Sequence, residues 1–253
     1  MNLMHGRLYH FMFATLSLVL CFNVLAQIPT PTDIEYGYPE SPPRTFTNAK
    51  GEPEGTHFRV AKALFSKAGI SWHATSYPPL RLIKNLQTGA TNFSILVKNE
   101  ALVDCCIYSR EPIDLEEIMV YWKENQSRIK SREDLIGKHI IVVRGYSYGG
   151  LISFLKDPVN KITIETAKDH LSAFDMLKLN RADYVIEYLG SANEALEQRP
   201  AMKNLPHEVV NTIGLYLVLS KTYPDADRAM VHLEEIYRAL DKNSQLKNYN
   251  KIK

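Results

Sequence analysis

The sequence predicts an α/β protein in which parallel-type sheets are flanked by helices. Strand-length apolar runs alternate along the chain with amphipathic segments of helix length, the order typical of parallel sheets. The run at residues 140–143, Ile-Ile-Val-Val, is apolar without alternation and fits a strand buried on both faces. With 253 residues, the chain is long enough for two lobes or for one larger domain.

The first part of the chain alternates strands with two helices. Apolar side chains at helical spacing begin a helix near Thr56, which Gly69 ends. A second helix follows Pro79 and ends at Gly89. The strands of this part are expected at residues 34–38, 70–74, 93–97 and 106–108, with polar connections at 42–46, 48–55 and 98–104.

The second part begins with a strand at residues 118–122, which is interpreted as a passage between the lobes. A short helix is expected to begin near Ser147 or Gly149. The further strands are predicted at 140–143, 162–164, 184–186 and 215–219, and the further helices at 169–179, 191–197 and 226–241.

A polar and aromatic loop follows the buried strand at 140–143. It contains Arg144, Tyr146, Ser147 and Tyr148. In open α/β sheets, ligands bind beyond the carboxyl ends of the strands, where loops and helix N-termini expose N–H groups. We therefore interpret this loop as one wall of a small-molecule cleft.

The N-terminus has the features of a secretory signal peptide. Arg7 precedes an apolar run at residues 11–22, and small residues up to Ala26 offer a cleavage site. An uncleaved membrane anchor is the alternative, but the run is too short to span a bilayer comfortably. Cys21 would suggest a lipoprotein, except that Leu20 stands where such a motif needs Gly or Ala. We expect cleavage after Ala26 and a periplasmic protein.

Composition limits the classes of partner and cofactor. Removing Arg7 with the signal peptide leaves 29 Lys and Arg against 28 Asp and Glu, and this balance disfavours nucleic acid as the main partner. The histidines form no HxH or HExxH motif, so no metal site and no cofactor are expected. Adjacent Cys105 and Cys106 cannot form a disulfide of the usual geometry with each other. They are interpreted as small buried hydrophobic residues, with a redox role as the alternative.

Five segments, taken in order, resemble the bacterial extracellular solute-binding proteins of family 3. The segments are GEPEGTHFRVAKALFSKAG at 51–69, the helix-Gly-strand step at 82–92, Tyr-Ser-Arg-Glu-Pro at 108–112, DLIGKHIIVVRG at 134–145 and Asn-Arg-Ala-Asp-Tyr-Val at 180–185. Together they span nearly all of residues 30–253. The family consists of periplasmic receptors best known for polar amino acids, which they deliver to ABC transporters.

The resemblance implies the type II periplasmic-binding-protein fold, in which two α/β lobes are joined by two crossover strands. The implied organisation is a signal peptide at residues 1–26, lobe one at 27–117 plus 212–253, and lobe two at 118–211. It also implies a non-enzymatic monomer that captures a small polar ligand, anionic or aromatic, in the cleft between the lobes. The implied partner is the membrane permease of an ABC transporter.

Two positions depart from the amino-acid-binding pattern of the family. The family's arginine for the substrate carboxylate follows a glutamate after the third strand, whereas Ala101 follows Glu100 here. The family's ammonium-binding aspartate aligns with Tyr188, or nearly with Glu187. An α-carboxylate is best held by a bidentate guanidinium, so these departures argue against an ordinary α-amino acid as ligand.

The candidate ligand-binding residues are charged, amide, hydroxyl and aromatic side chains near predicted strand ends or a helix start: Tyr36, Tyr38, Tyr77, Arg81, Lys98, Asn99, Arg144, Tyr146, Ser147 and Tyr188. Arg81 and Arg144 contact the ligand or are solvated surface arginines. Ser147 donates to the ligand or caps a helix. Lys98 and Asn99 would replace the missing arginine. Each tyrosine forms an aromatic wall or packs in a core.

Two other functions stay open at this point. Some family relatives are dehydratases that act on prephenate-like acids, and Glu187 would then serve as general acid. Product formation that is lost in the Glu187→Gln variant would identify such an enzyme. Alternatively, the protein is a ligand-sensing accessory module that presents its closed lobes to a membrane partner. Co-purification with a kinase ectodomain would identify this role.

Overall fold

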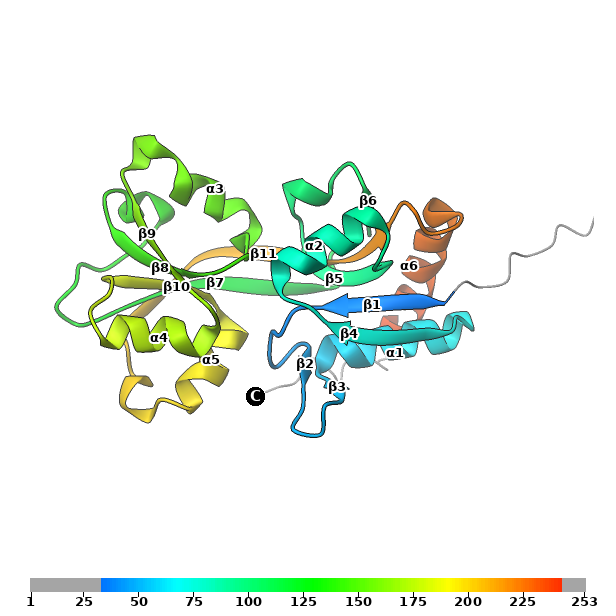
Figure 1. The fold of residues 1–253 in the computed structure, drawn as a ribbon, viewed down its shortest axis with the longest axis horizontal. Helices are drawn as coiled ribbons and strands as arrows, with labels where there is room; N and C mark the ends of the chain where they lie inside the picture. Colours follow the sequence, from blue (N-terminus) through cyan, green and yellow to red (C-terminus); the bar gives the residue numbers. More distant parts are fainter. Residues whose placement is uncertain (1–32, 243–253) are drawn as a thin grey trace, which may run out of the picture. The chain divides into compact units, whose positions relative to one another are not determined.

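One mixed sheet of nine strands runs through the described part of the chain, residues 33–242 of a computed structural model (Figure 1). Its strand order is β4-β1-β5-β11-β7-β10-β8-β9, and β6 pairs with β11. The predicted signal peptide at 1–26 lies outside the described residues. No helix within the described residues is long and apolar enough to cross a membrane.

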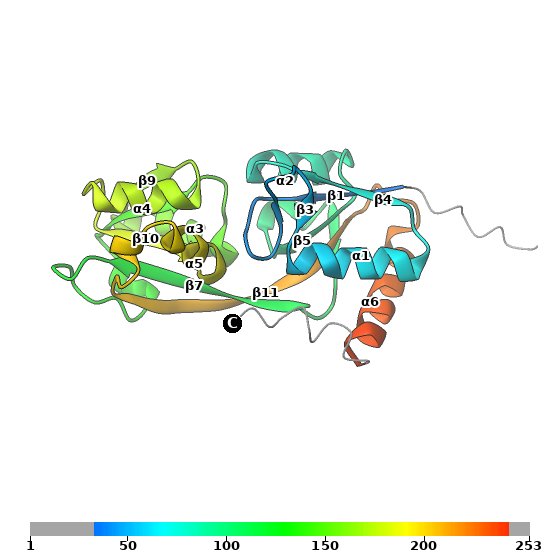
Figure 2. The same cartoon turned by 90° about the horizontal axis from the view of Figure 1, so that it is seen from below.

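The first lobe is built on parallel strands with helices on both faces. Its strands are β1 (Ile34–Tyr38), β4 (Trp72–Ser76), β5 (Phe93–Val97) and β6 (Cys106–Tyr108). Its helices are α1 (Thr56–Ala68), α2 (Pro79–Thr88) and α6 (Ala226–Lys242). β1 pairs in parallel with β4 and β5, and α2 lies on the opposite face from α1 and α6 (Figure 2).

Local chemistry explains where these helices end. Gly69 and Gly89 follow α1 and α2 with φ values of 67° and 77°, a left-handed conformation that glycine adopts at little cost. α1 then packs on the sheet through Phe65, whose ring lies 4.9 Å from that of Phe93 at an interplanar angle of 78°. Both side chains are fully buried, and burial of each contributes about 1.5–3 kcal/mol.

The second lobe repeats this design. Its strands are β8 (His139–Val143), β9 (Thr163–Ala167) and β10 (Tyr184–Tyr188), and its helices are α3 (Leu151–Lys156), α4 (His170–Lys178) and α5 (Leu189–Glu197). Ile140 and Val142 of β8 belong to the core that includes α3 residues, whereas Ile141 and Val143 belong to the core of α4 and α5. The apolar run without alternation is therefore a strand buried on both faces, as predicted.

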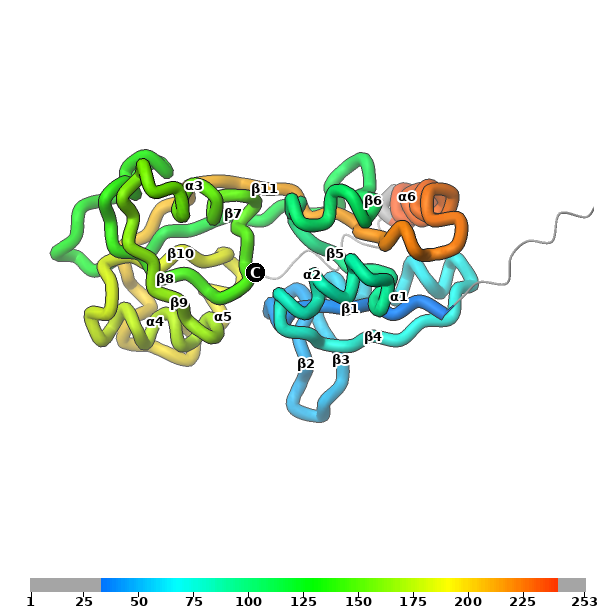
Figure 3. The backbone as a smooth tube through the Cα atoms, turned by 45° about the horizontal axis from the view of Figure 1, so that its top comes forward, coloured from blue at the N-terminus to red at the C-terminus, as the bar shows by residue number. Residues whose placement is uncertain are grey.

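Two long antiparallel strands carry the chain between the lobes, β7 (Asp114–Trp122) outward and β11 (His207–Ser220) back (Figure 3). The sequence predicted only 118–122 and 215–219. The remaining parts are rich in polar and half-exposed residues, so they contain no buried apolar run. The predicted lobe boundaries at 117/118 and 211/212 fall within these strands and stay a prediction.

Smaller differences from the predicted elements come from short or polar segments. The strands predicted at 70–74 and 162–164 lie at β4 and β9, a shift of one or two residues at their starts. The polar loop at 42–55 contains the hairpin β2 (Phe46–Thr47) and β3 (Pro53–Glu54), which is too short for a periodic pattern. Single-turn helices are η1 (Glu100–Leu102), η2 (Arg132–Leu135), η3 (Tyr148–Gly150), η4 (Pro158–Asn160) and η5 (Pro200–Met202).

The two adjacent cysteines are free thiols. Their sulfurs lie 3.5 Å apart, and Cys106 is buried while Cys105 is half-buried. Burial raises the pKa of the Cys106 thiol to about 12. A high pKa leaves little thiolate at neutral pH, so a reactive role for Cys106 is disfavoured.

Candidate functional site

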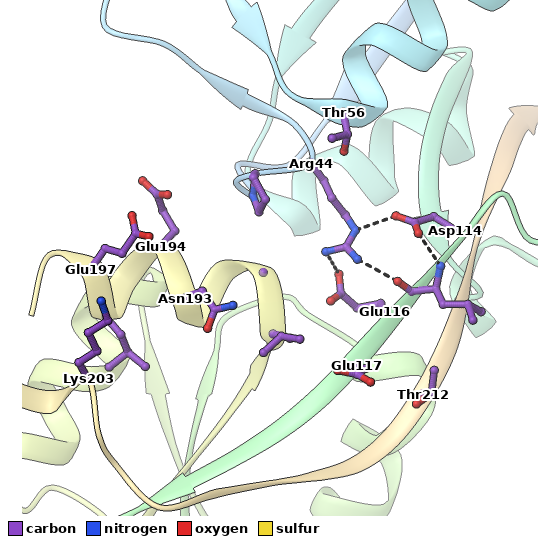
Figure 4. A pocket seen from close by; sticks show the side chains of 15 residues that line it. Arg44, Thr56, Asp114, Glu116, Glu117, Asn193, Glu194, Glu197, Lys203 and Thr212 are labelled. Atoms are coloured by element: carbon purple, nitrogen blue, oxygen red, sulfur yellow. Dashed lines mark hydrogen bonds and ion pairs between the residues drawn. The ribbon is translucent and has the colours of Figure 1, made fainter. Parts of the chain in front are cut away.

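A cleft of about 590 Å³ lies between α5 of the second lobe and the start of β7 (Figure 4). Arg44, in the loop between β1 and β2, and Glu116 of β7 line one wall. Glu194 and Glu197 of α5 line the opposite wall. Its volume lies within the range of about 300–1,000 Å³ that small-molecule sites occupy.

Arg44 ties its loop to the crossover strand β7. Its Nε donates to Asp114 Oδ2 at 3.2 Å, and its Nη1 lies 2.7 Å from Glu116 Oε2. Its Nη2 donates to the Leu115 carbonyl oxygen at 2.9 Å. His57 Nε2 lies 3.1 Å from the same Asp114 oxygen. Each guanidinium nitrogen thus already has an acceptor within the protein.

Burial sets the charges in this cluster. Burial raises the pKa of Glu116 to about 7, although the positive charge of Arg44 opposes the shift. Burial also lowers the pKa of His57 below its usual range, so its imidazole is neutral near pH 7. For Asp114, burial alone would raise the pKa, but the hydrogen bond from His57 and the charge of Arg44 outweigh it and lower the pKa.

Two smaller cavities, of about 60 and 50 Å³, lie between residues of both lobes. Leu96 and Val97 of the first lobe and Tyr146 and Tyr188 of the second line both cavities. The 60 Å³ cavity, called the inner pocket below, also contains Arg44, His57 and Glu116 in its lining. Arg44 and Glu116 therefore border both the large cleft and the inner pocket.

The tyrosines of this region are held by a tight turn. Tyr148 and Gly149 adopt φ values of 48° and 61°, and a Cβ added to Gly149 would lie 2.7 Å from Ile213 Cγ2. The buried Tyr148 accepts a hydrogen bond from the Val143 N–H at its hydroxyl (2.8 Å) and donates its own N–H to the Tyr188 hydroxyl (3.1 Å). The turn thereby fixes the loop in which Tyr146 projects toward the first lobe.

Tyr146 and His170 of the second lobe both contact the backbone of Glu40 in the first lobe. The Tyr146 hydroxyl donates to the Glu40 carbonyl oxygen at 3.0 Å, and His170 Nε2 lies 3.3 Å from the same oxygen. His170 Nδ1 lies 2.9 Å from Oε2 of the fully buried Glu187. These contacts hold the two lobes together at the inner pocket.

The His170–Glu187 pair is expected to make stability fall with rising pH. Burial alone would lower the pKa of His170, but the charge and hydrogen bond of Glu187 outweigh it and raise the pKa. The stabilisation is therefore fully present below about pH 6.5, the ordinary pKa of histidine, and is lost as pH rises through the raised value. In urea unfolding, the stability lost in His170→Gln is expected to be on the order of 1 kcal/mol larger at pH 5.5 than at pH 8.5.

The matched control is His232→Gln, because His232 is exposed on α6. A His170→Gln deficit that is equal at both pH values would show that folding does not raise the pKa of His170.

The predicted site residues fall into three groups. Asn99, Tyr146, Ser147 and Tyr188 line one or both of the two smaller cavities. The second group is the two tyrosines of β1 and the tyrosine that follows β4, whose hydroxyls form hydrogen bonds within the first lobe. The hydroxyls of Tyr36, Tyr38 and Tyr77 contact Thr45, Thr47 and Glu35, respectively.

The three predicted cationic residues, Arg81, Lys98 and Arg144, form the third group and line none of the three cavities. Arg81 and Arg144 are exposed, and Lys98 Nζ lies 4.6 Å from the centre of the Tyr216 ring. Sequence reasoning missed Arg44 and Glu116, which lie in a polar loop and an acidic strand start. The alternation of Asp114 and Glu116 on one side of a strand is the only local signal that could have indicated them.

No group of three His, Cys, Asp or Glu side chains in the described part of the chain is arranged to hold a metal ion.

No protein-family model and no curated protein matches the sequence. Solved structures, in contrast, match over most of the chain. An ancestral arginine-binding protein bound to arginine matches with a TM-score of 0.70 at 21% identity, over 87% of this chain and 97% of that one.

Two further structures match to a similar degree. A histidine kinase sensor domain with similarity to periplasmic binding proteins has a TM-score of 0.74 at 13% identity, over 87% of this chain and 95% of that one. This chain has the fold of the periplasmic binding proteins. An ancestral amino-acid-binding protein, described as a precursor of cyclohexadienyl dehydratase, has a TM-score of 0.68 at 20% identity, over 86% of this chain and 92% of that one.

Proposed function

We propose that this protein is a periplasmic solute-binding protein that captures a small polar molecule between its two lobes for uptake by an ABC-type permease. The observation that carries the proposal is the pair of smaller cavities lined by residues of both lobes, where Tyr146 of the second lobe also donates to the Glu40 carbonyl oxygen of the first. A ligand that contacts both lobes favours the closed state because it binds that state more tightly. The binding proteins among the similar structures support the same role.

The first test is native mass spectrometry of the protein purified from periplasm, before and after mild denaturation. A co-purified small molecule that is released on denaturation would support the proposal and identify the ligand. Small-angle scattering should then show a smaller radius of gyration when that molecule is added back to the stripped protein. A ligand that binds without any compaction would contradict capture by lobe closure.

Closure is expected to be blocked by a side chain at Gly190, the second residue of α5. A Cβ at this position would lie 2.9 Å from Arg44 Nη1 and 3.0 Å from Pro43 Cδ, both in the first lobe. Such overpacking costs about 1–3 kcal/mol, so Gly190→Val should weaken ligand binding by roughly tenfold. Gly190→Ala is the graded control, because Arg44 can shift to admit one methyl group. Equal affinity in the wild type and Gly190→Val would contradict the predicted contact.

The sensor role is the second candidate, favoured by the likeness to a kinase sensor domain. A sensor would bind its ligand in the same cleft as a transport receptor but would have a different membrane partner. Capture of a kinase ectodomain in place of a permease therefore distinguishes the sensor role from the transport role. The dehydratase hypothesis assigned Glu187 as general acid. Glu187 is fully buried against His170 and lines none of the three cavities, so this geometry does not favour it.

A further inference from the structure

Glu116 places an unpartnered carboxylate oxygen beside the large cleft. Its side chain is only 3% exposed, and Oε2 lies 2.7 Å from Arg44 Nη1. Oε1 is buried and has no hydrogen-bond partner among the described residues. Glu116 lines both the large cleft and the inner pocket, so its carboxyl group borders both spaces.

A buried acceptor without a partner costs about 1–3 kcal/mol, and more when it is charged. This cost applies to Oε1 whether the carboxyl group is ionised or protonated, because neither form has a partner for it. A ligand that brings an N–H donor to Oε1 removes the cost, and a positively charged donor removes most of it. The site thus favours a cationic group at Glu116.

The charge of the whole cleft points the same way. Five carboxylate side chains line it, from Asp114, Glu116, Glu117, Glu194 and Glu197, against the two cations Arg44 and Lys203. The three nitrogens of Arg44 already contact Asp114, Glu116 and the Leu115 carbonyl. A ligand carboxylate would therefore meet mostly negative charge and would have to compete for Arg44.

The carboxylates are spread over two walls. Figure 4 shows Glu194 and Glu197 on α5, across the cleft from Glu116. No group of three acidic or other ligating side chains in the described range could hold a metal ion. Because the carboxylates stand on two opposite walls, an extended organic cation can contact both. The inner pocket adds Tyr146 and Tyr188, whose rings can face a cation.

We propose that the cleft binds a linear organic cation without a carboxylate, of the diamine or guanidinoamine class. One ammonium or guanidinium group donates to Glu116 Oε1, and the second lies near Glu194 and Glu197 on the opposite wall. The inference rests on the proposed solute-binding role and specifies its ligand class. It separates this protein from receptors of α-amino acids, since these need a group that holds a carboxylate.

The test is isothermal titration calorimetry of the stripped protein with agmatine, spermidine, L-arginine and glutarate. Agmatine or spermidine is expected to bind, and L-arginine, which adds a carboxylate to the agmatine structure, at least roughly tenfold more weakly. Glu116→Gln should weaken cation binding by roughly tenfold or more, because the amide carries no negative charge and its NH2 group, a donor, replaces Oε1 when its oxygen accepts from Arg44. Glu194→Gln with Glu197→Gln should weaken spermidine binding further.

Glu235→Gln is the matched control, an exposed glutamate on α6 that should leave the affinity unchanged. Circular dichroism of each variant establishes that it is folded. The proposal is overturned if neither cation binds, if L-arginine binds more tightly than agmatine, or if folded Glu116→Gln keeps full cation affinity. A co-purified neutral or anionic ligand that compacts the protein would overturn this inference while leaving the solute-binding role intact.

Discussion

At pH 8, the ligand-free Glu116→Gln variant is expected to resist unfolding better than the wild type by on the order of 3 kcal/mol. The reason is that burial raises the pKa of Glu116 from 4.5 to about 7 in the folded protein. The folded state therefore holds a proton between these two pH values that the unfolded state has released. The wild type loses stability as pH rises from 4.5 to about 7, and a neutral side chain removes this loss.

Urea unfolding at pH 5 and pH 8 measures the effect. At pH 5 the folded carboxyl group is mostly protonated, so the advantage of Glu116→Gln should shrink to below about 1 kcal/mol. The amide oxygen of the substituted side chain can still accept from Arg44, so the interaction with Arg44 is not lost. Glu235→Gln controls for the loss of a negative charge. An advantage that is the same at both pH values would show that the Glu116 carboxyl group titrates normally.

Arg44→Met is expected to destabilise the protein by about 3–5 kcal/mol at pH 8. The Arg44 side chain is only 18% exposed, and its guanidinium supplies donors to Asp114, Glu116 and the Leu115 carbonyl. Methionine fills a similar volume but leaves these acceptors without their partner. A buried ion pair that loses one member leaves an uncompensated charge, which costs more than the intact pair contributes.

The double variant Arg44→Met with Glu116→Gln separates charge from packing. Removing the Glu116 charge should recover a large share of the loss, so the coupling energy between the two positions is expected to exceed about 1 kcal/mol. Arg132→Met is the control, because Arg132 pairs with Glu133 at an exposed position. If Arg44→Met costs the same with and without the glutamate, the loss comes from packing and not from the ion pair.

Local patterns in the sequence predicted most helices and several strands. α1 and α2 carry apolar side chains at helical spacing and end at Gly69 and Gly89, so the chain itself marks their ends. β8 carries an apolar run that is buried on both faces, and β5 is mostly apolar. The long strands β7 and β11 were predicted only in part, because pairing with each other stabilises their polar parts.

The residues of the candidate site were likewise predicted only in part from the sequence. Tyr146, Ser147 and Tyr188 were identifiable because they lie at or just after the ends of buried strands, where the sheet edge opens toward a ligand. They line the two smaller cavities. Arg144 follows the same rule and Arg81 was chosen for its place at a helix start, yet both are exposed and line none of the three cavities. The position of a residue in the sequence predicts that it lies at this edge of the sheet, but it does not predict the direction in which a flexible side chain points.

Local sequence patterns were sufficient to indicate alternating strands and helices in this chain, because periodicity, glycine and proline act over a few residues. Folding brings Arg44 against Asp114 and Glu116, which lie about seventy positions further along the chain, and no local pattern predicts that contact. The burial of these side chains and the unpartnered Glu116 oxygen depend on how the loop after β1 packs on β7. The acidic character of the cleft arises from that packing and from α5 facing it, although the protein as a whole is close to neutral.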